Sequence, residues 1–436
     1  MLRTLAAEAA RRFGRRVSFA AVRPAETPLP AGLAGAGVQP RLAEAQAAAP
    51  AELPGAPQRA ESWGVSYADL DRLSDEAAAG LAFRGVLPGD VVAVALPAAP
   101  EFPICYLAAG KIGAVVAGLD PGWPPASLDR FTELLRPTVT IAPPGLGIGP
   151  GPDGELVRIT LASEGAPALA GLRRAESPPP PLPPDPARPV VIVFTSGLTG
   201  TPCGAVFGVN QLDAIRTAEA GDRWGTAVGN VVLTAIPFAH YNFMTRLPAM
   251  MQSGQSCFLM DSWRPERVLD VATAVRANRL TGLPGQLAEL AAHPLPAGAA
   301  LPAVELIVTG HTTVPAGLVS VLRQRFGAGV QVRYGCAEAG LGLSAWPDDP
   351  AGDVDGYVGS PASGVTLALR DAGGHEVPRG QFGDVLLRSA ACMSGYWNDP
   401  QASAAAFTSD RFVRTGDRGR IDDQGRLVLA AHAGPG

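Results

Sequence analysis

The sequence predicts an α/β protein in which parallel strands alternate with helices, followed by a smaller β-rich region. Apolar runs at 91–96 and 114–120 flank an apolar stretch of helical length at 103–113, which is the pattern of a βαβ unit. After about residue 359 the pattern changes to short apolar runs at 365–369, 383–387 and 427–429, separated by glycine turns. A chain of 436 residues is too long for one ordinary core, so two or three subdomains are expected.

The remaining elements follow in order. Residues 2–20 place apolar side chains at helical spacing and predict an N-terminal helix, and residues 21–62, rich in Ala, Pro and Gly, predict an extended loop or insertion. Ser66 leads into a second helix, and residues 85–90 form a turn before the βαβ unit. The proline-dense residues 177–189 predict a stiff surface connector. Strand and helix signals then alternate at 231–236, 256–260, 268–278, 280–283, 306–308 and 318–326.

Composition and charge exclude several classes of protein. A net charge of −5 argues against a nucleic-acid-binding surface, and no apolar run is long enough for a membrane span. The N-terminus lacks the apolar core of a signal peptide, and the five cysteines form no CxxC pair, so we expect a cytoplasmic protein without a zinc or disulfide framework. Lys111 is the only lysine, so a mechanism that needs two lysines cannot run on this chain alone.

A glycine-spaced loop at 194–204 is the most informative motif. It follows an apolar run at 189–193 that reads as a buried parallel strand, and its sequence is Phe-Thr-Ser-Gly-Leu-Thr-Gly-Thr-Pro-Cys-Gly. Glycine allows close approach of the backbone to an anion, while hydroxyls and N–H groups donate to phosphate oxygens. The spacing fits neither GxxxxGK[ST] nor GxGxxG. The alternative is an ordinary Gly/Thr turn between a strand and the next element.

The loop closely resembles the [YF]-T-S-G-[ST]-T-G-x-P-K-G signature of the adenylate-forming superfamily, which includes acyl-CoA synthetases, adenylation domains of nonribosomal peptide synthetases, and luciferases. Further segments resemble family landmarks in the same order, at 66–70, 107–115, 237–240, 308–312, 334–338, 380–388, 393–400 and 412–417. The resemblance implies two parallel-sheet α/β subdomains plus a small distorted β-barrel subdomain, at about 360–429, within a large domain spanning 1–429. It also makes Lys111 a family-typical helix position without a catalytic role.

The resemblance implies ATP and Mg²⁺ as cofactors, a small carboxylic acid as substrate, and CoA or carrier-protein phosphopantetheine as a possible acceptor. Thr195, Ser196, Thr199 and Glu338 would be catalytic, with Glu338 and Thr199 at the metal. The nucleotide would contact Gly197, Gly200, Gly310, His311, Tyr334, Gly335 and Asp417, with Tyr334 stacked on adenine and Asp417 on the ribose hydroxyls. His240 and Gly335 would border the acyl group. Taken alone, His240 also fits a buried, hydrogen-bonded histidine, and Asp417 fits a common turn.

The sequence departs from the family pattern in several places. Cys203 replaces the usual lysine, Ala337 a threonine and His311 a glycine. Residues 430–436 occupy the hinge position, so we expect the small C-terminal domain and its lysine to be absent or supplied by a separate chain. Two functions stay open: activation of a carboxylic acid to an acyl-adenylate, and a non-catalytic relative that binds nucleotide, acyl ligand or a protein partner as a scaffold. A different reaction with Cys203 or Cys336 as nucleophile is disfavoured, because neither has a neighbouring base in sequence.

Overall fold

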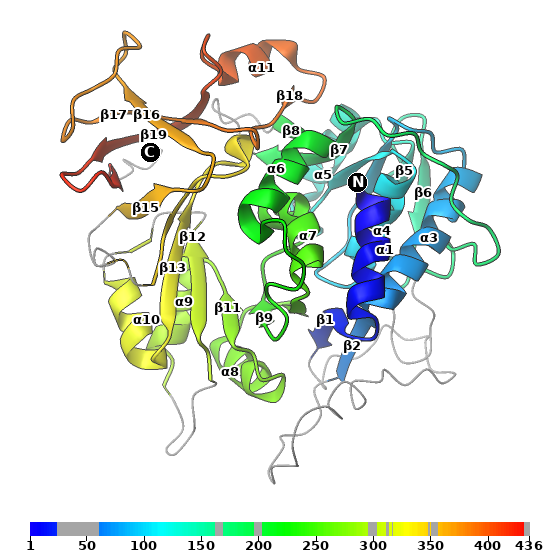
Figure 1. Ribbon diagram of the computed structural model, residues 1–436. Coiled ribbons are helices and arrows are strands. Elements are labelled where there is room, and N and C mark those ends of the chain that lie inside the picture. The colour runs from blue at the N-terminus through cyan, green and yellow to red at the C-terminus, as the bar shows by residue number, and fades with distance from the viewer. Residues whose placement is uncertain are drawn as a thin grey trace.

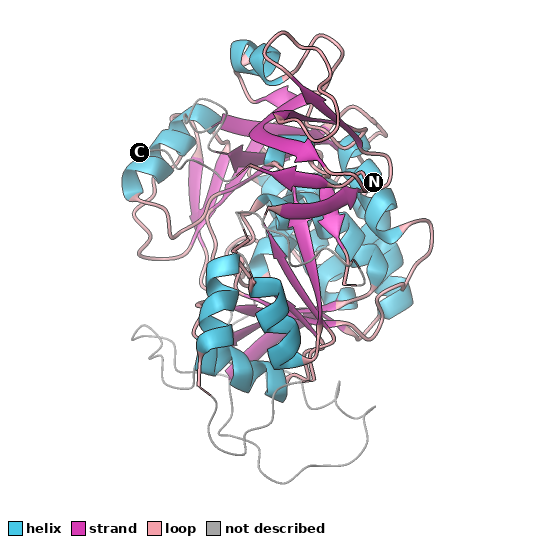
Figure 2. Cartoon of the chain, turned by 90° about the vertical axis from the view of Figure 1, so that its left-hand side faces the viewer, coloured by secondary structure: helices cyan, strands magenta, loops and turns pink. Residues whose placement is uncertain are grey.

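The computed structural model describes residues 1–23, 61–161, 169–195, 203–294, 303–310, 314–315, 317–347, 349 and 356–430, with side chains at 61–63 excepted. These residues form two sheets with helices between and around them (Figure 1). Seen from a direction turned by 90°, the helices lie on both sides of the strands (Figure 2). The predicted α/β fold class is therefore confirmed.

The first sheet has seven strands in the order β18-β8-β7-β4-β3-β5-β6. Strands β7, β4, β3, β5 and β6 are mutually parallel, whereas β8 and β18 run antiparallel to their neighbours. The bounds are β3 Val91–Val94, β4 Val115–Gly118, β5 Val139–Ala142, β6 Glu155–Arg158, β7 Pro189–Thr195, β8 Cys203–Gly208 and β18 Gly395–Tyr396. The helices beside it are α1 Leu2–Phe13, α3 Tyr67–Phe83, α4 Glu101–Lys111 and α5 Pro125–Leu135. The predicted βαβ unit is confirmed as β3, α4 and β4.

The second sheet joins the remaining thirteen strands. Its parallel part is β1-β10-β9-β11-β12-β13, and its antiparallel part continues through β14, β15, β20, β19, β17 and β16. The bounds are β1 Val17–Arg23, β2 Glu61–Ser66, β9 Val231–Thr234, β10 Ser256–Met260, β11 Arg279–Thr281, β12 Leu306–Gly310, β13 Gly329–Tyr334, β14 Leu343–Ala345, β15 Tyr357–Pro361, β16 Thr366–Arg370, β17 Gly383–Arg388, β19 Val413–Ile421 and β20 Leu427–Leu429. The β-rich C-terminal region predicted from the glycine-separated runs is present.

The remaining helices cover the second sheet and the C-terminal region. They are α6 Val209–Ala220, α7 Tyr241–Ser253, α8 Pro265–Ala274, α9 Pro284–Ala292, α10 Leu318–Phe326, the 3₁₀ turn η1 Ala337–Ala339, and α11 Pro400–Ala406. Helices α6 and α7 lie between the two sheets (Figure 1). Met244 and Leu247 of α7 share a core with Val191 and Val193 of β7, so α7 is packed firmly against the first sheet.

The N-terminal segment differs from the sequence prediction. A single helix was expected over residues 2–20, but α1 ends at Phe13, and residues 17–23 form strand β1. Gly14 ends the helix with φ 47°, a conformation that favours glycine. Strand β1 pairs with β10 in parallel and with β2 antiparallel, and these long-range pairings outweigh the local helical spacing. Residues 24–60 of the expected insertion lie outside the described part of the chain. The ends of the loop expected over 21–62 are strands instead, because residues 21–23 belong to β1 and residues 61–62 to β2.

Lys111, the last residue of α4, ties this helix to α3. Its side chain is fully buried, and Nζ donates to Asp71 Oδ1 and Asp75 Oδ1, each at 2.7 Å, and to the carbonyl of Asp71 at 3.0 Å. All three contacts of the ammonium are with helix α3, which gives this lysine a structural explanation.

Candidate active site

A buried carboxylate, Glu338, lies where the two sheets approach each other. Its Oε1 accepts hydrogen bonds from Thr195 Oγ1 and from Tyr396 OH, each at 2.8 Å. Thr195 is the last residue of β7, Glu338 lies in η1 directly after β13, and Tyr396 lies in β18. The fold thus brings two predicted site residues together and adds Tyr396. That tyrosine lies in the motif at 393–400, which was noted in the sequence without a role for this side chain.

A second carboxylate, Asp417, pairs with the aromatic residue at the end of β13. Tyr334 OH donates to Asp417 Oδ2 at 2.7 Å, and the amide N–H of Asp417 donates to Thr415 Oγ1 at 3.1 Å. The Thr415 hydroxyl donates in turn to the Val385 carbonyl, which fixes the turn to β17. Burial and the Asp417 carboxylate raise the pKa of Tyr334, so its hydroxyl stays a proton donor. Two residues predicted to contact the same nucleoside are therefore in direct contact.

Two predicted glycines have different physical reasons. Gly310 ends β12 with φ 141°, and a Cβ there would lie 2.0 Å from the carbonyl oxygen of Arg333 on the neighbouring strand. Only glycine fits at that position. A Cβ on Gly335 would approach no closer than 3.5 Å, to Gly342 Cα, which is an ordinary contact. Packing therefore tolerates a larger residue at Gly335, and any need for glycine there comes from what binds beside it.

His240 caps the N-terminus of α7. Its Nδ1 accepts a hydrogen bond from the Asn242 amide at 3.3 Å, and its ring lies 4.9 Å from that of Tyr241. Burial, with a smaller contribution from the Arg246 guanidinium, lowers the pKa of His240 to about 4, so the imidazole is neutral at physiological pH. This geometry fits the alternative of a buried structural histidine. A contact with the acyl group stays a prediction.

The predicted phosphate loop is described only at its ends. Thr195 and Cys203 are paired across the antiparallel strands β7 and β8, so the loop leaves and re-enters the sheet beside Glu338. Ser196, Gly197, Thr199, Gly200 and His311 lie outside the described residues, and their roles stay predictions.

The two cysteines considered as nucleophiles are held as thiols. Burial and the neighbouring Glu338 carboxylate raise the pKa of Cys336. Burial and the carboxylates of Asp399 and Glu338 raise the pKa of Cys203. A nucleophilic cysteine needs a lowered pKa, so the electrostatics disfavour this reaction.

A cavity of about 770 Å³ extends from this site along the second sheet. Tyr334 and Gly335 line it at the carboxyl ends of the strands, and Tyr241 and Arg246 line it from α7. The size suits a small organic ligand, and the position at strand ends is where ligands bind in open α/β sheets.

Comparison with known proteins places these observations in a family. A model of AMP-binding enzymes matches residues 45–397. This chain belongs to the AMP-binding enzyme family. It is 29% identical over 366 residues to a feruloyl-CoA synthase from Amycolatopsis sp, which covers 83% of this chain and 72% of that protein. It is also 29% identical to an indoleacetate–CoA ligase from Aromatoleum aromaticum, with the same coverage, and 26% identical to 4-coumarate–CoA ligase 5 from Oryza sativa, over 84% of this chain and 70% of that protein.

The fold agrees with solved structures of this family. The inhibitor-bound N-terminal domain of FACL13 from Mycobacterium tuberculosis has a TM-score of 0.78 at 20% identity, covering 99% of both chains. ATP-bound MatB from Rhodopseudomonas palustris has a TM-score of 0.75 at 21% identity, covering 98% of this chain and 78% of that one. The family model over residues 45–397 confirms the expected family, and the named relatives are acid–CoA ligases.

Within this family fold, Glu338 is a carboxylate that could hold a divalent cation. Both of its hydrogen bonds converge on Oε1, which leaves Oε2 to face a cation, and Mg²⁺ prefers such hard oxygen ligands. Over the described ranges, no group of three His, Cys, Asp or Glu side chains forms a metal cage by itself. A magnesium ion here would therefore need phosphate oxygens or water as further ligands. In the same part of the chain, no helix is long and apolar enough to cross a membrane.

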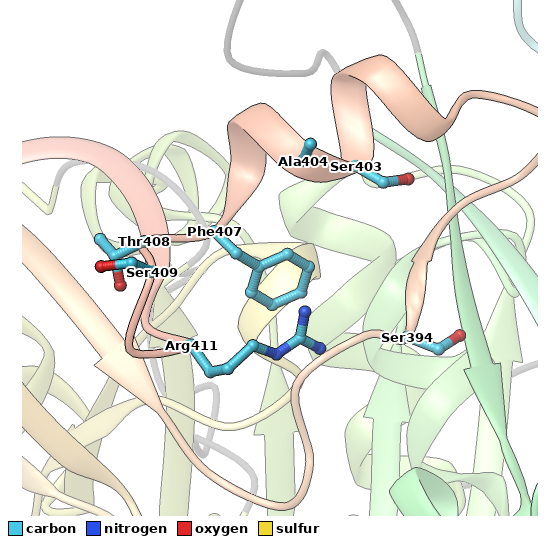
Figure 3. A pocket seen from close by; sticks show the side chains of 7 residues that line it. All are labelled: Ser394, Ser403, Ala404, Phe407, Thr408, Ser409 and Arg411. Atoms are coloured by element: carbon cyan, nitrogen blue, oxygen red, sulfur yellow. The ribbon is translucent and has the colours of Figure 1, made fainter.

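A smaller hollow of about 310 Å³ lies at α11 and the turn after it (Figure 3). The Arg411 guanidinium lies over the Phe407 ring, with 4.2 Å between the guanidinium carbon and the ring centroid (Figure 3). Three of the hydroxyls around it already bond within the protein: Ser394 donates to Val206, Ser403 to Asp399 and Thr408 to Asp410. We therefore assign this hollow no part in the site.

Proposed function

We propose that this protein uses ATP and Mg²⁺ to convert a carboxylic acid into an acyl-adenylate, and that CoA or the phosphopantetheine of a carrier protein then takes the acyl group. A carboxylate oxygen of the acid attacks the α-phosphorus of ATP, and the bond from that phosphorus to pyrophosphate breaks. The acceptor thiol, after losing its proton, displaces AMP from the acyl carbon.

The observation that carries the proposal is the convergence of two hydrogen-bonded pairs. Thr195 and Glu338, separated by 143 residues, and Tyr334 and Asp417, separated by 83, meet at the same end of β13. Both pairs consist of residues that the family motifs assign to one nucleotide. An accidental turn at Asp417 would not place its carboxylate against the predicted adenine-stacking ring.

In this proposal the residues act by positioning and electrostatics. Bound Mg²⁺ supplies positive charge to the phosphates, and Glu338 would hold it, oriented by Thr195 and Tyr396. Asp417 would accept the ribose hydroxyls, with Tyr334 against the adenine. Ser196 and Thr199 would donate to the phosphates, whereas Thr195 would border the phosphates with its hydroxyl proton used on Glu338, and Gly310 with His311 would border the adenine edge.

Around the acyl group, His240 and Gly335 would border the reacting carboxylate. Because Nδ1 accepts from the Asn242 amide, the neutral imidazole of His240 carries its proton on Nε2, which can donate to an oxygen of the acid. Named relatives act on ferulate, coumarate and indoleacetate, which supports a carboxylic acid of moderate size.

The test is carboxylate-dependent exchange of pyrophosphate into ATP, run across fatty, aromatic and amino acids. Exchange with one class of acid is expected. Calorimetry should show that Mg²⁺ tightens ATP binding in the wild type, and that Glu338→Gln removes this difference. Glu289→Gln, which changes an exposed carboxylate on α9, is the matched control and should behave like the wild type.

The scaffold alternative predicts a different result. Cys203 and Ala337 stand where the family has two polar groups near the phosphates. Their loss is expected to slow the formation of the acyl-adenylate more than it weakens the binding of ATP. Magnesium-dependent ATP binding without exchange for any acid would support the non-catalytic relative. Equal ATP binding by the wild type and Glu338→Gln would show that the metal assignment is wrong.

A further inference from the structure

The face of the second sheet that lines the cavity carries polar and charged side chains among apolar ones. In β9, β11, β12 and β13, alternate residues point to opposite faces. One set packs with the helices α8 to α10 in an apolar core: Leu233, Leu280, Ile307, Val330 and Val332. The other set faces the cavity and includes Thr234, Arg279, Thr281, Gln331 and Arg333, beside the apolar Val232, Leu306 and Val308. Ligand pockets are mostly apolar with a few placed polar groups that orient the ligand, so the arginines on this face indicate where a polar part of a ligand would bind.

Positive charge predominates on the cavity wall. Of the described residues that line it, the charged ones are Arg246, Arg279, Arg333 and Glu219. Arg246 Nε donates to Glu219 Oε1 at 2.6 Å, and Arg333 Nη1 lies 3.4 Å from the same oxygen. Arg246 also donates to the Gly340 carbonyl at 3.1 Å, so its guanidinium is well satisfied. The carboxylate of Glu219 is thus shared by two guanidinium groups, and it makes no ion pair with Arg279 among the described contacts.

Arg279 lines the cavity at a distance from the proposed reaction site. It is in register with Leu306 on β12, whereas Arg333 is in register with Gly310, four residues further along that strand. At about 3.3 Å per residue, the two rows are separated by roughly 13 Å along the sheet. Arg279 therefore lies near the amino ends of the strands, while Tyr334 and Gly335 lie at the carboxyl ends.

The guanidinium of Arg279 has no acidic partner within the described part of the chain. Its Nε is buried and makes no hydrogen bond there. Arg279 as a whole is partly exposed, and a hydrocarbon tail placed against its guanidinium would remove its water without replacing those hydrogen bonds, which is costly. An anionic group of a ligand would instead supply the missing charge and accept from the planar guanidinium in a bidentate manner.

We propose that the acid activated by this protein carries a second anionic group, such as a carboxylate, at the end remote from the reacting carboxylate, and that Arg279 binds it. This inference rests on the proposed function, because it describes the substrate of the same site. Arg333 and Arg246, held by Glu219 nearer the reaction site, add to the positive potential along the path.

The experiment compares matched acids that differ only at the remote end. Monocarboxylic acids and the corresponding α,ω-dicarboxylic acids of increasing length are tested in pyrophosphate exchange, together with cinnamate, 4-hydroxycinnamate and 4-carboxycinnamate. Variants are Arg279→Met, which keeps similar bulk without charge, and Arg279→Lys, which keeps the charge. Arg11→Met, on the exposed side of α1, is the control.

The expected result is a preference of the wild type for one dicarboxylic acid over its monocarboxylic partner by roughly 10- to 100-fold in kcat/KM, the range of a charged hydrogen bond. Arg279→Met should lose this preference by slowing only the dicarboxylic acid, Arg279→Lys should keep part of it, and Arg11→Met should keep all of it. A wild type that prefers the uncharged acids, or an Arg279→Met variant that keeps the preference, overturns the inference while the proposed function stands.

Failure of the proposed function is distinguishable. If no acid supports exchange, the activation reaction is wrong, and calorimetric titration of the dicarboxylic acids into the protein decides the inference by itself. Binding that disappears in Arg279→Met and persists in Arg11→Met supports the anion site. Absence of binding to the wild type, or equal binding to Arg279→Met, overturns it. If Arg279→Met does not fold, the wild-type comparison and Arg279→Lys provide the same decision.

Discussion

Asp417→Asn offers the sharpest test of the nucleotide site. The substitution keeps the size of the side chain and removes its charge. In the wild type one carboxylate oxygen of Asp417 is engaged by Tyr334 OH at 2.7 Å, so the side chain is held in place before the nucleotide arrives. If Asp417 accepts the ribose hydroxyls, ATP loses charge-assisted hydrogen bonds in the variant.

The magnitude follows from the number and kind of bonds. A hydrogen bond to a charged group contributes about 1.5–3 kcal/mol, which corresponds to roughly 10- to 100-fold in affinity. Removing one ribose hydroxyl from the nucleotide should cost the wild type a similar factor. In Asp417→Asn that factor should fall to a few-fold, because the charged acceptor is already gone. Tyr334→Phe, which keeps the ring and removes only the hydroxyl, should weaken ATP binding less than Asp417→Asn does.

The assay is calorimetric titration of ATP, 2′-deoxy-ATP and 3′-deoxy-ATP, each with Mg²⁺, into the wild type and both variants. Arg11→Met serves again as the control for a remote change. The reasoning is refuted if the wild type binds all three nucleotides equally, or if Asp417→Asn still discriminates against the deoxynucleotides as strongly as the wild type.

Three further predictions concern single residues. Gly335→Ala should change the free energy of unfolding by less than about 0.5 kcal/mol but raise the KM for the acid by roughly 10-fold. Gly342→Ala should lower the free energy of unfolding by about 1–3 kcal/mol, because its Cβ would lie 2.0 Å from the Tyr334 carbonyl oxygen. Equal effects of the two variants in denaturant titration and in kinetics would contradict this. Lys111→Met should lower the free energy of unfolding in urea by about 2 kcal/mol without changing the affinity for ATP. This loss is smaller than for a fully buried ion pair, because Asp71 and Asp75 are partly exposed. An unchanged urea midpoint would contradict the role of Lys111 in holding α4 against α3. The pKa of His240 falls from 6.5 to about 4 on folding, so protonation favours the unfolded state. As pH falls from 6.5 to 4, the free energy of unfolding of the wild type should decrease by roughly 3 kcal/mol relative to that of His240→Asn, whereas above pH 7 the two should vary with pH in the same way. Parallel stability curves between pH 6.5 and 4 would count against a buried neutral imidazole.

Much of the fold follows from local patterns. The apolar runs around α4 predict β3 and β4 because a fully buried parallel strand needs apolar residues on both faces. The segments at 318–326 and 427–429 match α10 and β20, since each apolar pattern is closed by glycine or flanking polar residues. Local patterns do not predict β1, because the apolar spacing of residues 2–20 is helical throughout. The strand forms by pairing with β10, whose residues lie more than 230 positions further along the chain.

The site was predictable as a set of residue types in order, and less so as a geometry. The motifs indicate Thr195, Glu338, Tyr334 and Asp417, because carboxylates, hydroxyls and an aromatic ring are what a magnesium nucleotide requires. Nothing local indicates that Tyr396 donates to Glu338, or that His240 caps α7 and is neutral there. Both facts depend on burial and on neighbours from distant parts of the chain.

The family, the order of strands and helices over most of the chain, and the residues that motif spacing assigns to a nucleotide could be read from the amino-acid sequence, because these depend on local periodicity and on residue identity. The pairing of groups, the glycine required by packing, and the position of Arg279 in the cavity without an acidic partner among the described residues became clear only from the three-dimensional arrangement. Those properties arise from strand register and burial, which join residues that the sequence keeps far apart.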